Sequence, residues 1–381
     1  MTIKHLGLGK DRGMTLIFVG LSMLAFMSAT MLALDVGNLM VARTQAQASA
    51  DSGALAGATA MLFDDFNDRS ATGAAVRNAI AASTSSQNRV INVNVSVIPE
   101  DVTFPAIDKI RVSVFRTTAR GNPVATFLGP MVGISTVDVG AVATAQVSPA
   151  NAETCVKPFT IPDRWTEKQT GPWDPTDTFD KYDSHGNLVA NPDVYIPADQ
   201  PGYTGYNATR DKGMPLIIRA GTGNNISPTM YFSWKMPSAI GADYYRDNIS
   251  GCNTTLVHWG DLMQQEPGNM DGPTNQGIDD LIARDPGAYW DNSCNCVKGS
   301  AYGGSSPRIA PIPLYDPNYY ADGKANGRNA DFKVANWIGF FIESRSGNNV
   351  TGRINPILGV TDNNAGPAPI GIFPQSLRLI E

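Results

Sequence analysis

The sequence predicts an α+β protein with a transmembrane helix extended into a small α/β sheet module and followed by a β-rich, loop-rich domain that contains disulfides. Three observations support this prediction. Residues 13–34 form an uncharged apolar stretch, residues 35–150 mix helical and strand-like patterns, and residues 151–381 interleave Trp, Tyr, Pro and Asn with little helical period. The chain has 381 residues, which is long enough for two or three units with cores of their own.

Residues 13–34 have the composition of a membrane-spanning helix, because about 20 apolar residues cross the hydrocarbon core of a bilayer. No A-x-A cleavage pattern follows at the right place just after them, so we expect an uncleaved anchor rather than a signal peptide. A buried core helix is the alternative. Lys4, Lys10 and Arg12 make the preceding flank positive, which favours a cytoplasmic tail of residues 1–12 and an exported body.

The anchor helix is expected to continue outside the membrane, because no proline interrupts residues 13–62. Asp35 marks the point where the helix leaves the hydrocarbon, and a charge costs little at the wet interface. Small residues then recur every three or four positions, at Ala46, Ala50, Gly53, Ala54, Gly57, Ala58 and Met61. Such a face allows close packing of another backbone. We expect it to pack on the protein's own sheet, with self-association as the alternative.

The remaining elements follow from local patterns. The module is predicted to contain a helix at 69–84, strands at 89–98 and 109–116 with 101–108 as their connection, a short helix at 123–134 broken near Pro130, and a strand at 135–148. This order suggests a small antiparallel sheet covered by helices. In residues 151–381 we expect one helix that begins at Thr274 and stops before Pro286, and a hairpin whose strands flank residues 345–349.

The four cysteines, Cys155, Cys252, Cys294 and Cys296, all lie on the exported side, where disulfides persist. Side chains alternate in an extended segment, so a bond across Asn295 would be strained. We therefore expect the last two cysteines each to pair with one of the first two. A zinc site is the alternative because His258 is near Cys252, but the spacing lacks a C-x-x-C pair.

Several functional classes find little support. The net charge is −6 without a dense basic patch, so no nucleic-acid partner is expected. No phosphate-binding glycine loop is present, and we expect no cofactor. His185 and His258 are the only histidines available to an exported catalytic triad, and no G-x-S-x-G motif accompanies them. A periplasmic hydrolase is therefore supported only by the size of residues 151–381.

An acidic loop offers the other candidate site. The stretch DPTDTFDKYDSHGN contains Asp174, Asp177, Asp180 and Asp183. Oxygen-rich loops can bind calcium, but this spacing is not that of an EF-hand. We interpret the aspartates as turn and cap residues. Calcium binding remains the alternative, together with an aromatic binding face formed by Trp165, Trp173, Tyr182 and Tyr195.

The residues around the membrane exit carry a specific motif. The apolar span is followed by Asp35-Val36-Gly37, then Arg43, then QAQASADSGALAGA. This pattern resembles the N-terminal module of TadG-like proteins of the tight-adherence (Tad/Flp) pilus-assembly systems. The matching positions are Asp35, Gly37, Arg43, Ala50, Asp51, Ala54, Leu55, Ala56, Gly57 and Ala58, whereas Gln45-Ala46 and Ser52-Gly53 depart from the usual form. Residues 126–147 resemble the end of that module, so the resemblance covers about residues 12–150.

The resemblance implies a single-pass protein of the inner membrane with a periplasmic body that serves pilus assembly as a structural, non-enzymatic component. Its partners would be inner-membrane lipid and other pilus-assembly proteins or pilins. Larger relatives carry a von Willebrand A-type domain with a D-x-S-x-S metal site, but this motif is absent here, so no metal site is carried over. Related pseudopilins are cut after a glycine that has Glu five residues later; Phe18 occupies that position after Gly13, so we expect the anchor to be retained. A membrane-tethered adhesin or carbohydrate- or protein-binding module is the alternative function.

Overall fold

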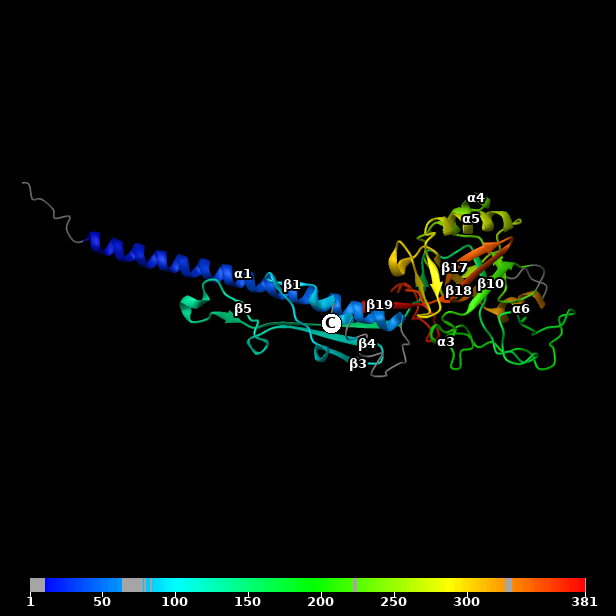
Figure 1. Ribbon diagram of the computed structural model, residues 1–381, viewed down its shortest axis with the longest axis horizontal. Coiled ribbons are helices and arrows are strands. Elements are labelled where there is room, and N and C mark those ends of the chain that lie inside the picture. The colour runs from blue at the N-terminus through cyan, green and yellow to red at the C-terminus, as the bar shows by residue number, and fades with distance from the viewer. Residues whose placement is uncertain are drawn as a thin grey trace, which may run out of the picture. The chain divides into compact units, whose positions relative to one another are not determined.

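The chain forms two compact units. One contains Met1–Gln146 and Leu377–Glu381, and the other contains Val147–Ser376. The computed structural model describes residues 11–63, 78, 80–82, 84–221, 225–325 and 331–380. The mixed helix and strand content confirms the predicted α+β class (Figure 1).

The first unit is built on one long helix, α1 (Asp11–Phe63), as the proline-free sequence predicts. Its second half packs on a four-stranded sheet of order β19-β7-β4-β3 (Figure 1). The strands are β3 (Val102–Ala106), β4 (Lys109–Arg116), β7 (Val139–Pro149) and β19 (Gln375–Leu379). In β4 every second residue is buried, beginning with Ile110, because one face of the strand covers the helix. The strand predicted at 109–116 is thus confirmed as β4, and most of the strand predicted at 135–148 is β7.

One predicted strand and one predicted connection in this unit are wrong. Residues 89–98 do not form one strand but a hairpin of β1 (Arg89–Val90) and β2 (Val93–Asn94), because Ile91 and Asn92 adopt left-handed conformations with φ of 48° and 59°. The expected connection at 101–108 contains β3 after a 3₁₀ turn, η1 (Pro99–Asp101). The helix predicted at 69–84 lies largely outside the described residues.

The helix predicted at 123–134 is also wrong. This stretch forms β5 (Val124–Ala125), the 3₁₀ turn η3 (Gly129–Val132) and the approach to β6 (Thr136–Val137), which pairs with β5. Gly133, with φ of 86°, ends the turn in a left-handed conformation. The apolar residues are therefore presented by a loop. Before it lies another short 3₁₀ turn, η2 (Thr118–Arg120).

The second unit is a mixed β-barrel. Strand pairings run from β17 through β16, β9, β11, β10 and β18 back to β17, which closes the ring, and β13 adds to β17 outside it. The bounds are β9 (Phe159–Pro162), β10 (Pro215–Ala220), β11 (Met230–Ser233), β13 (Leu262–Met263), β16 (Ile309–Tyr315), β17 (Phe332–Ser346) and β18 (Asn349–Asn355). The β10–β11 and β16–β9 pairs are parallel, and the others are antiparallel. Closure leaves these strands without a free edge along their paired regions.

Short elements surround the barrel. They are β8 (Ala152–Glu153), α3 (Ala208–Asp211), α4 (Ala242–Ser250), β12 (Val257–His258), α5 (Asp271–Ala283), β14 (Tyr289–Asp291), β15 (Cys296–Lys298), η4 (Gly303–Ser305) and α6 (Pro317–Ala325). The helix predicted from Thr274 is α5, but it begins at Asp271. Thr274 therefore lies within the helix, where its side chain is buried, and is not the N-cap residue. The hairpin predicted around residues 345–349 is that of β17 and β18.

Two large groups of buried side chains lie in the core of this unit, beside a smaller one around Trp290. The first joins barrel residues such as Phe340 and Ile312 to the apolar faces of α4 and α5, which pack against each other. The second is aromatic: the rings of Phe232, Tyr315 and Phe332 lie 5.1–6.1 Å apart at their centroids. The interleaved aromatic residues of the sequence are thus largely core residues.

Candidate functional site

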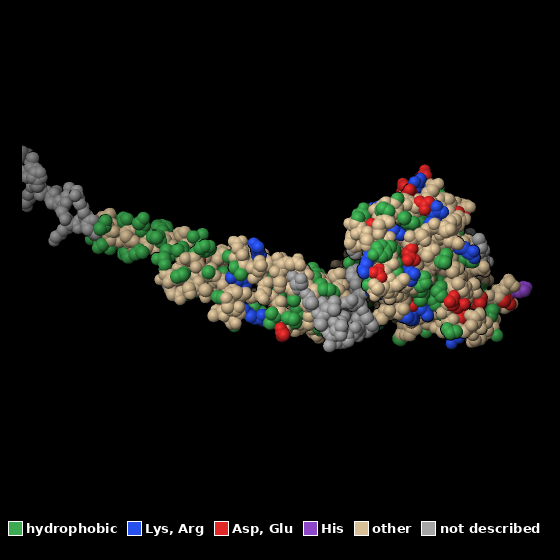
Figure 2. Space-filling model, viewed as in Figure 1, with side chains coloured by type: hydrophobic (Ala, Val, Ile, Leu, Met, Phe, Trp, Pro, Cys, Tyr) green, Lys and Arg blue, Asp and Glu red, His purple; other side chains and the backbone are tan. Residues whose placement is uncertain are grey.

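The first half of α1 has the properties of a membrane anchor. It contains an 18-residue window with a mean hydropathy of 2.1, none of which is buried by the protein. Figure 2 shows many hydrophobic side chains on the surface of the free part of α1. The hydroxyl groups of Ser28 and Thr30 donate to the carbonyl oxygens one turn earlier, each at 2.8 Å, so these polar groups need no water.

Asp35 lies directly after the apolar stretch and holds a distant loop against the helix. One carboxylate oxygen accepts the backbone N–H of Phe127 at 2.6 Å, and the other accepts the N–H of Gly129 at 2.9 Å and of Leu128 at 3.2 Å. The side chain of Asn38, one turn further along α1, donates to the carbonyl of Ala125 at 3.4 Å. We call the contact between Asp35 and these three N–H groups the Asp35 clamp.

The clamped loop, residues 126–135, is closed by its own hydrogen bonds. Its ends meet where Thr126 N–H donates to Ser135 at 3.1 Å, and Ile134 N–H donates to Gly129 at 2.9 Å. Gly129 has no room for a side chain, because a Cβ atom there would lie 2.1 Å from the carbonyl oxygen of Ile134 and 2.4 Å from the hydroxyl of Thr126. The loop therefore presents a defined row of N–H groups to the carboxylate.

The small-residue face of the outer half of α1 is buried within the same unit, as packing on the protein's own sheet predicts. Ala50, Ala54 and Ala58 are fully buried. Added Cβ atoms would lie 2.3 Å from the Ile110 side chain at Gly57 and 2.0 Å from the Ser85 hydroxyl at Gly53. The close approach of β4 and of the 81–85 segment therefore requires glycine at these positions.

Polar contacts fix the register of this packing. The hydroxyl groups of Ser49 and Ser85 each donate to the carbonyl oxygen of the other residue at 2.8 Å, fully shielded from water. The side chain of Gln45 accepts the N–H of Ile91 at 2.7 Å, which positions the β1–β2 turn on the helix. These contacts add hydrogen-bond specificity to an otherwise apolar seam.

The other motif residues point away from this seam. Gly37 faces open space, and Arg43 is exposed. Asp51 is half-buried and accepts the side-chain amide of Gln47 at 2.8 Å, while that amide also donates to the carbonyl of Val142 at 3.1 Å. Leu55 is half-buried. The motif thus divides into a buried packing face and an exposed face.

The disulfide connectivity differs from the prediction. Cys155 bonds to Cys252, and Cys294 bonds to Cys296. The second bond would be strained in an extended segment, but Asn295 has a φ of 48° at the turn between β14 and β15. This left-handed residue reverses the chain and brings its two neighbours to the same side. The first bond links residues 97 apart in sequence.

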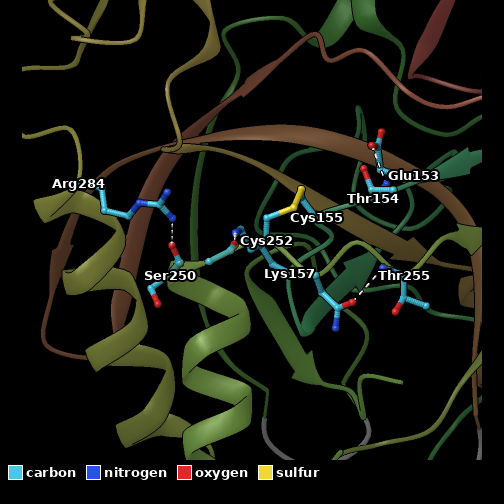
Figure 3. Close-up of a disulfide and its surroundings, with 10 residues drawn as sticks. Glu153, Thr154, Cys155, Lys157, Ser250, Cys252, Thr255 and Arg284 are labelled. Carbon is cyan, nitrogen blue, oxygen red and sulfur yellow. Dashed lines mark hydrogen bonds between the residues drawn. A yellow bond between two sulfur atoms is a disulfide. The ribbon is translucent and has the colours of Figure 1, made fainter. Parts of the chain in front are cut away.

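The first disulfide lies at the carboxyl end of α4, where the side chains of Lys157 and Arg284 also donate hydrogen bonds (Figure 3). Lys157 Nζ donates to the carbonyl of Gly251 at 2.8 Å, and the Arg284 guanidinium donates to the carbonyl of Ser250. Cations stabilise the unpaired carbonyl groups at a helix end. Burial, aided by the charge of Arg284, lowers the pKa of Lys157 to about 7.

Two buried carboxyl groups, those of Glu153 and Asp163, lie close to Cys155 and Lys157 in the sequence and have different surroundings. Burial raises the pKa of Glu153 to about 8, against one opposing hydrogen bond from the N–H of Thr154. Burial also raises the pKa of Asp163, to about 6. The Asp163 carboxylate accepts hydroxyl groups from Tyr203 at 2.7 Å and Tyr195 at 3.0 Å, so it joins several loops of the second unit. This is a structural network, because its polar atoms are satisfied internally and closed to solvent.

The acidic loop uses its aspartates for local hydrogen bonds. Asp174 accepts the N–H and the hydroxyl of Thr176, and Asp183 accepts the N–H groups of His185 and Asn187. These bonds lower the pKa of both carboxyls. The pattern is that of turn residues, as the sequence interpretation predicts. Within the described residues, no three His, Cys, Asp or Glu side chains gather in a way that could hold a metal ion.

His258 is flanked by carboxylates on both ring nitrogens. Its Nε2 lies 3.0 Å from Asp362, and its Nδ1 lies 3.6 Å from Asp261. A general base in a triad needs one nitrogen directed to a nucleophile and the other to an orienting group. Here both positions face acidic partners, so the geometry is that of a surface histidine held between two carboxyl groups. His185 is exposed on the acidic loop, where its ring meets the hydroxyl of Ser184 at 3.4 Å.

These features define a class of protein in which the described residues contain one candidate membrane span, whose continuous helical extension carries a folded module. Over residues 13–60 the chain matches the family model described as "Putative Flp pilus-assembly TadE/G-like". The match confirms the resemblance over residues 13–60, where the chain is similar to a TadE/G-like pilus-assembly domain. No curated protein and no solved structure matches the chain.

Sequence reasoning did not identify the partners of the motif. The Asp35 clamp joins residues more than ninety positions apart, and the predicted helix at 123–134 concealed the row of N–H groups that receives the carboxylate. The glycines at 129 and 133, separated by Pro130, were the available signal for a loop. The sequence pattern also gave no indication that Ser85 contacts α1 at Ser49.

Proposed function

We propose that this protein is a non-enzymatic, membrane-anchored structural component of a Tad/Flp-type pilus-assembly apparatus. The family match covers the span and its extension. The observation that carries the proposal is the division of α1 into two halves. The apolar half is not covered by the rest of the protein, whereas the motif half contacts the module through the Asp35 clamp and the small-residue face. The motif residues thus serve to mount a rigid body on a membrane helix.

In this proposal the anchor spans the inner membrane once, with a cytoplasmic N-terminus and a periplasmic body. The positive flank before the span supports that orientation. The disulfides support an oxidising compartment for the body. The working parts are the span, the α1 extension and the disulfide-containing barrel unit.

The proposed partners are membrane lipid and other pilus-assembly proteins or pilins. The small-residue face is already covered by the chain's own sheet and 81–85 segment, so it offers no surface for a second copy. Assembly contacts would therefore use exposed surfaces, such as those around Gly37 and around Arg43 on α1. This assignment gives the exposed motif residues a role distinct from that of the buried ones.

Deleting the gene in its native host and counting surface pili by electron microscopy tests the proposal. We expect pili to be lost and to return when the intact gene is restored. Point variants are preferable to truncation at residue 150, because β19 supplies an edge strand to the first sheet and truncation would remove it. Normal pili in the deletion strain, together with lost attachment to surfaces, would favour the adhesin instead.

A further inference from the structure

We propose that the loop of residues 126–135 is a second membrane contact, which inserts Phe127, Met131 and Ile134 into the lipid surface beside the anchor helix. The inference rests on the proposed membrane anchoring and adds a lipid-binding surface to it. These side chains are 71%, 70% and 53% exposed. Exposures of this size match those of the span itself, where Phe18 is 63% and Leu24 is 62% exposed.

The clamp determines the depth of the loop. Asp35 directly follows the apolar stretch, whose length corresponds to the hydrocarbon thickness of a bilayer. The N–H groups of Phe127 and Gly129 lie 2.6 and 2.9 Å from the Asp35 carboxylate. The loop is therefore held at the level where the helix leaves the hydrocarbon, and its apolar side chains lie within reach of the interfacial region.

The loop is suited to a poorly hydrated environment. No charged residue occurs between Gly121 and Val137. Internal hydrogen bonds satisfy the N–H and carbonyl groups at its base, and the Thr126 hydroxyl donates to the carbonyl of Ile134 at 2.6 Å. Three consecutive N–H groups of the loop solvate the Asp35 carboxylate. Polar groups that are already paired cost less to move from water to lipid.

Continuity with the anchor identifies lipid as the occupant of this surface. Beyond Asp35 the helix still exposes Val36, Met40 and Val41, at 41%, 65% and 49%, before Arg43. The helix and the loop thus both expose apolar side chains just beyond the end of the span. A surface continuous with a membrane-spanning segment at the same level meets the same bilayer.

The test places single reporters on the full-length chain in vesicles of phosphatidylcholine and phosphatidylglycerol. All four native cysteines are in disulfides, so an introduced cysteine supplies the one thiol for a fluorescent label. The reporter is Ile134→Cys, and the matched control is Ile107→Cys, because both isoleucines are 53% exposed in the same unit. The control position is distant from the Asp35 clamp. Ile107 lies three positions before Ile110, which contacts α1 at Gly57. Gly57 is about 33 Å along the helix from Asp35.

Lipids that carry a nitroxide near the headgroup and aqueous iodide serve as opposing quenchers. We expect severalfold stronger lipid quenching at position 134 than at position 107, and the reverse order for iodide. A label at Phe26→Cys reports the span separately, through quenching by nitroxides deep in the acyl chains. Quenching at position 26 combined with iodide-accessible position 134 would overturn the loop contact and leave the anchor intact, whereas absent lipid quenching at both positions would overturn both.

Two further measurements separate lipid insertion of the loop from burial of the same loop against another protein chain. Met131→Cys is a second reporter on the loop, and it should behave as position 134 does if labelling has left the loop folded. Adding Asp35→Ala to Ile134→Cys should reduce the lipid quenching, because the clamp no longer sets the depth of the loop. Self-quenching of the position 134 label that disappears on dilution with unlabelled chain, without lipid quenching, would show a protein–protein contact and overturn the proposal.

Discussion

Replacing Asp35 by alanine should release the 126–135 loop while α1 remains folded. The substitution removes the acceptor of three backbone N–H groups, two of which are bound at 2.6 and 2.9 Å. Hydrogen bonds to a charged group contribute about 1.5–3 kcal/mol, and water replaces part of what is lost at this half-exposed site. Taking that range for the whole clamp, opening of the loop becomes about 10- to 150-fold more frequent.

Hydrogen exchange of the full chain in detergent measures this change. We expect the amides of Phe127 and Gly129 to exchange faster by that factor, with the amides of β4 unchanged. Asp51→Ala is the matched control, because Asp51 is a half-buried aspartate of the same helix that accepts the side-chain amide of Gln47 rather than the loop N–H groups. Unchanged exchange at the loop in Asp35→Ala, or equal acceleration in the control, would refute the clamp.

Three other perturbations have defined outcomes. Gly57→Leu should destabilise the first unit by about 1–3 kcal/mol in chemical unfolding, because even a Cβ atom would lie 2.3 Å from Ile110, whereas Gly37→Leu, in open space, should not. Serine in place of both cysteines of the Cys155 bond should lower the free energy of unfolding by about 2–5 kcal/mol, since this bond closes a long loop, and an unchanged urea midpoint would contradict that origin. Because burial raises the pKa of Glu153 to about 8, the folded state retains a proton that the unfolded state releases above about 4.5. Stability should therefore fall as pH rises between these values, by up to about 1.4 kcal/mol per pH unit, and urea titrations at pH 6 and 8 should show a smaller fall in Glu153→Gln.

The long helix and the alternating strands were predictable because local pattern determines them. An uninterrupted apolar stretch followed by small residues at helical spacing describes α1, and period-two alternation describes β4. The connections between them were not predictable in the same way. The turn at Ile91 and Asn92 depends on left-handed conformations that neither side chain requires, so the local pattern indicates one continuous strand.

The barrel and the site contacts depend on distant partners. Closure of the barrel requires β18 to pair with both β10 and β17, and no local feature of residues 349–355 indicates the first pairing. The return of β19 to the first sheet is likewise absent from any local pattern. Asp35 could be recognised as a motif residue, but its acceptor role depends on a loop that local apolar periodicity described as a helix.

The wrong disulfide prediction has a simple physical origin. An extended segment from Cys294 to Cys296 would point the two side chains apart, whereas a single left-handed residue between them changes the directions of both. Asparagine is one of the few residues that adopts this conformation readily, so Asn295 was the signal that could have corrected the pairing. Once these two cysteines pair with each other, Cys155 and Cys252 remain as partners.

The central claim, that the protein serves pilus assembly as a membrane-anchored structural component, is tested most directly by restoring the deletion strain with Leu24→Arg and counting surface pili. A charge in the middle of the span should prevent stable anchoring. Leu188→Arg is the control, because Leu188 is 61% exposed in the barrel unit and Leu24 is 62% exposed. We predict pili with the control and none with Leu24→Arg, whose chain should leave the membrane fraction. Normal pili with a chain that no longer sediments with membranes would contradict the claim.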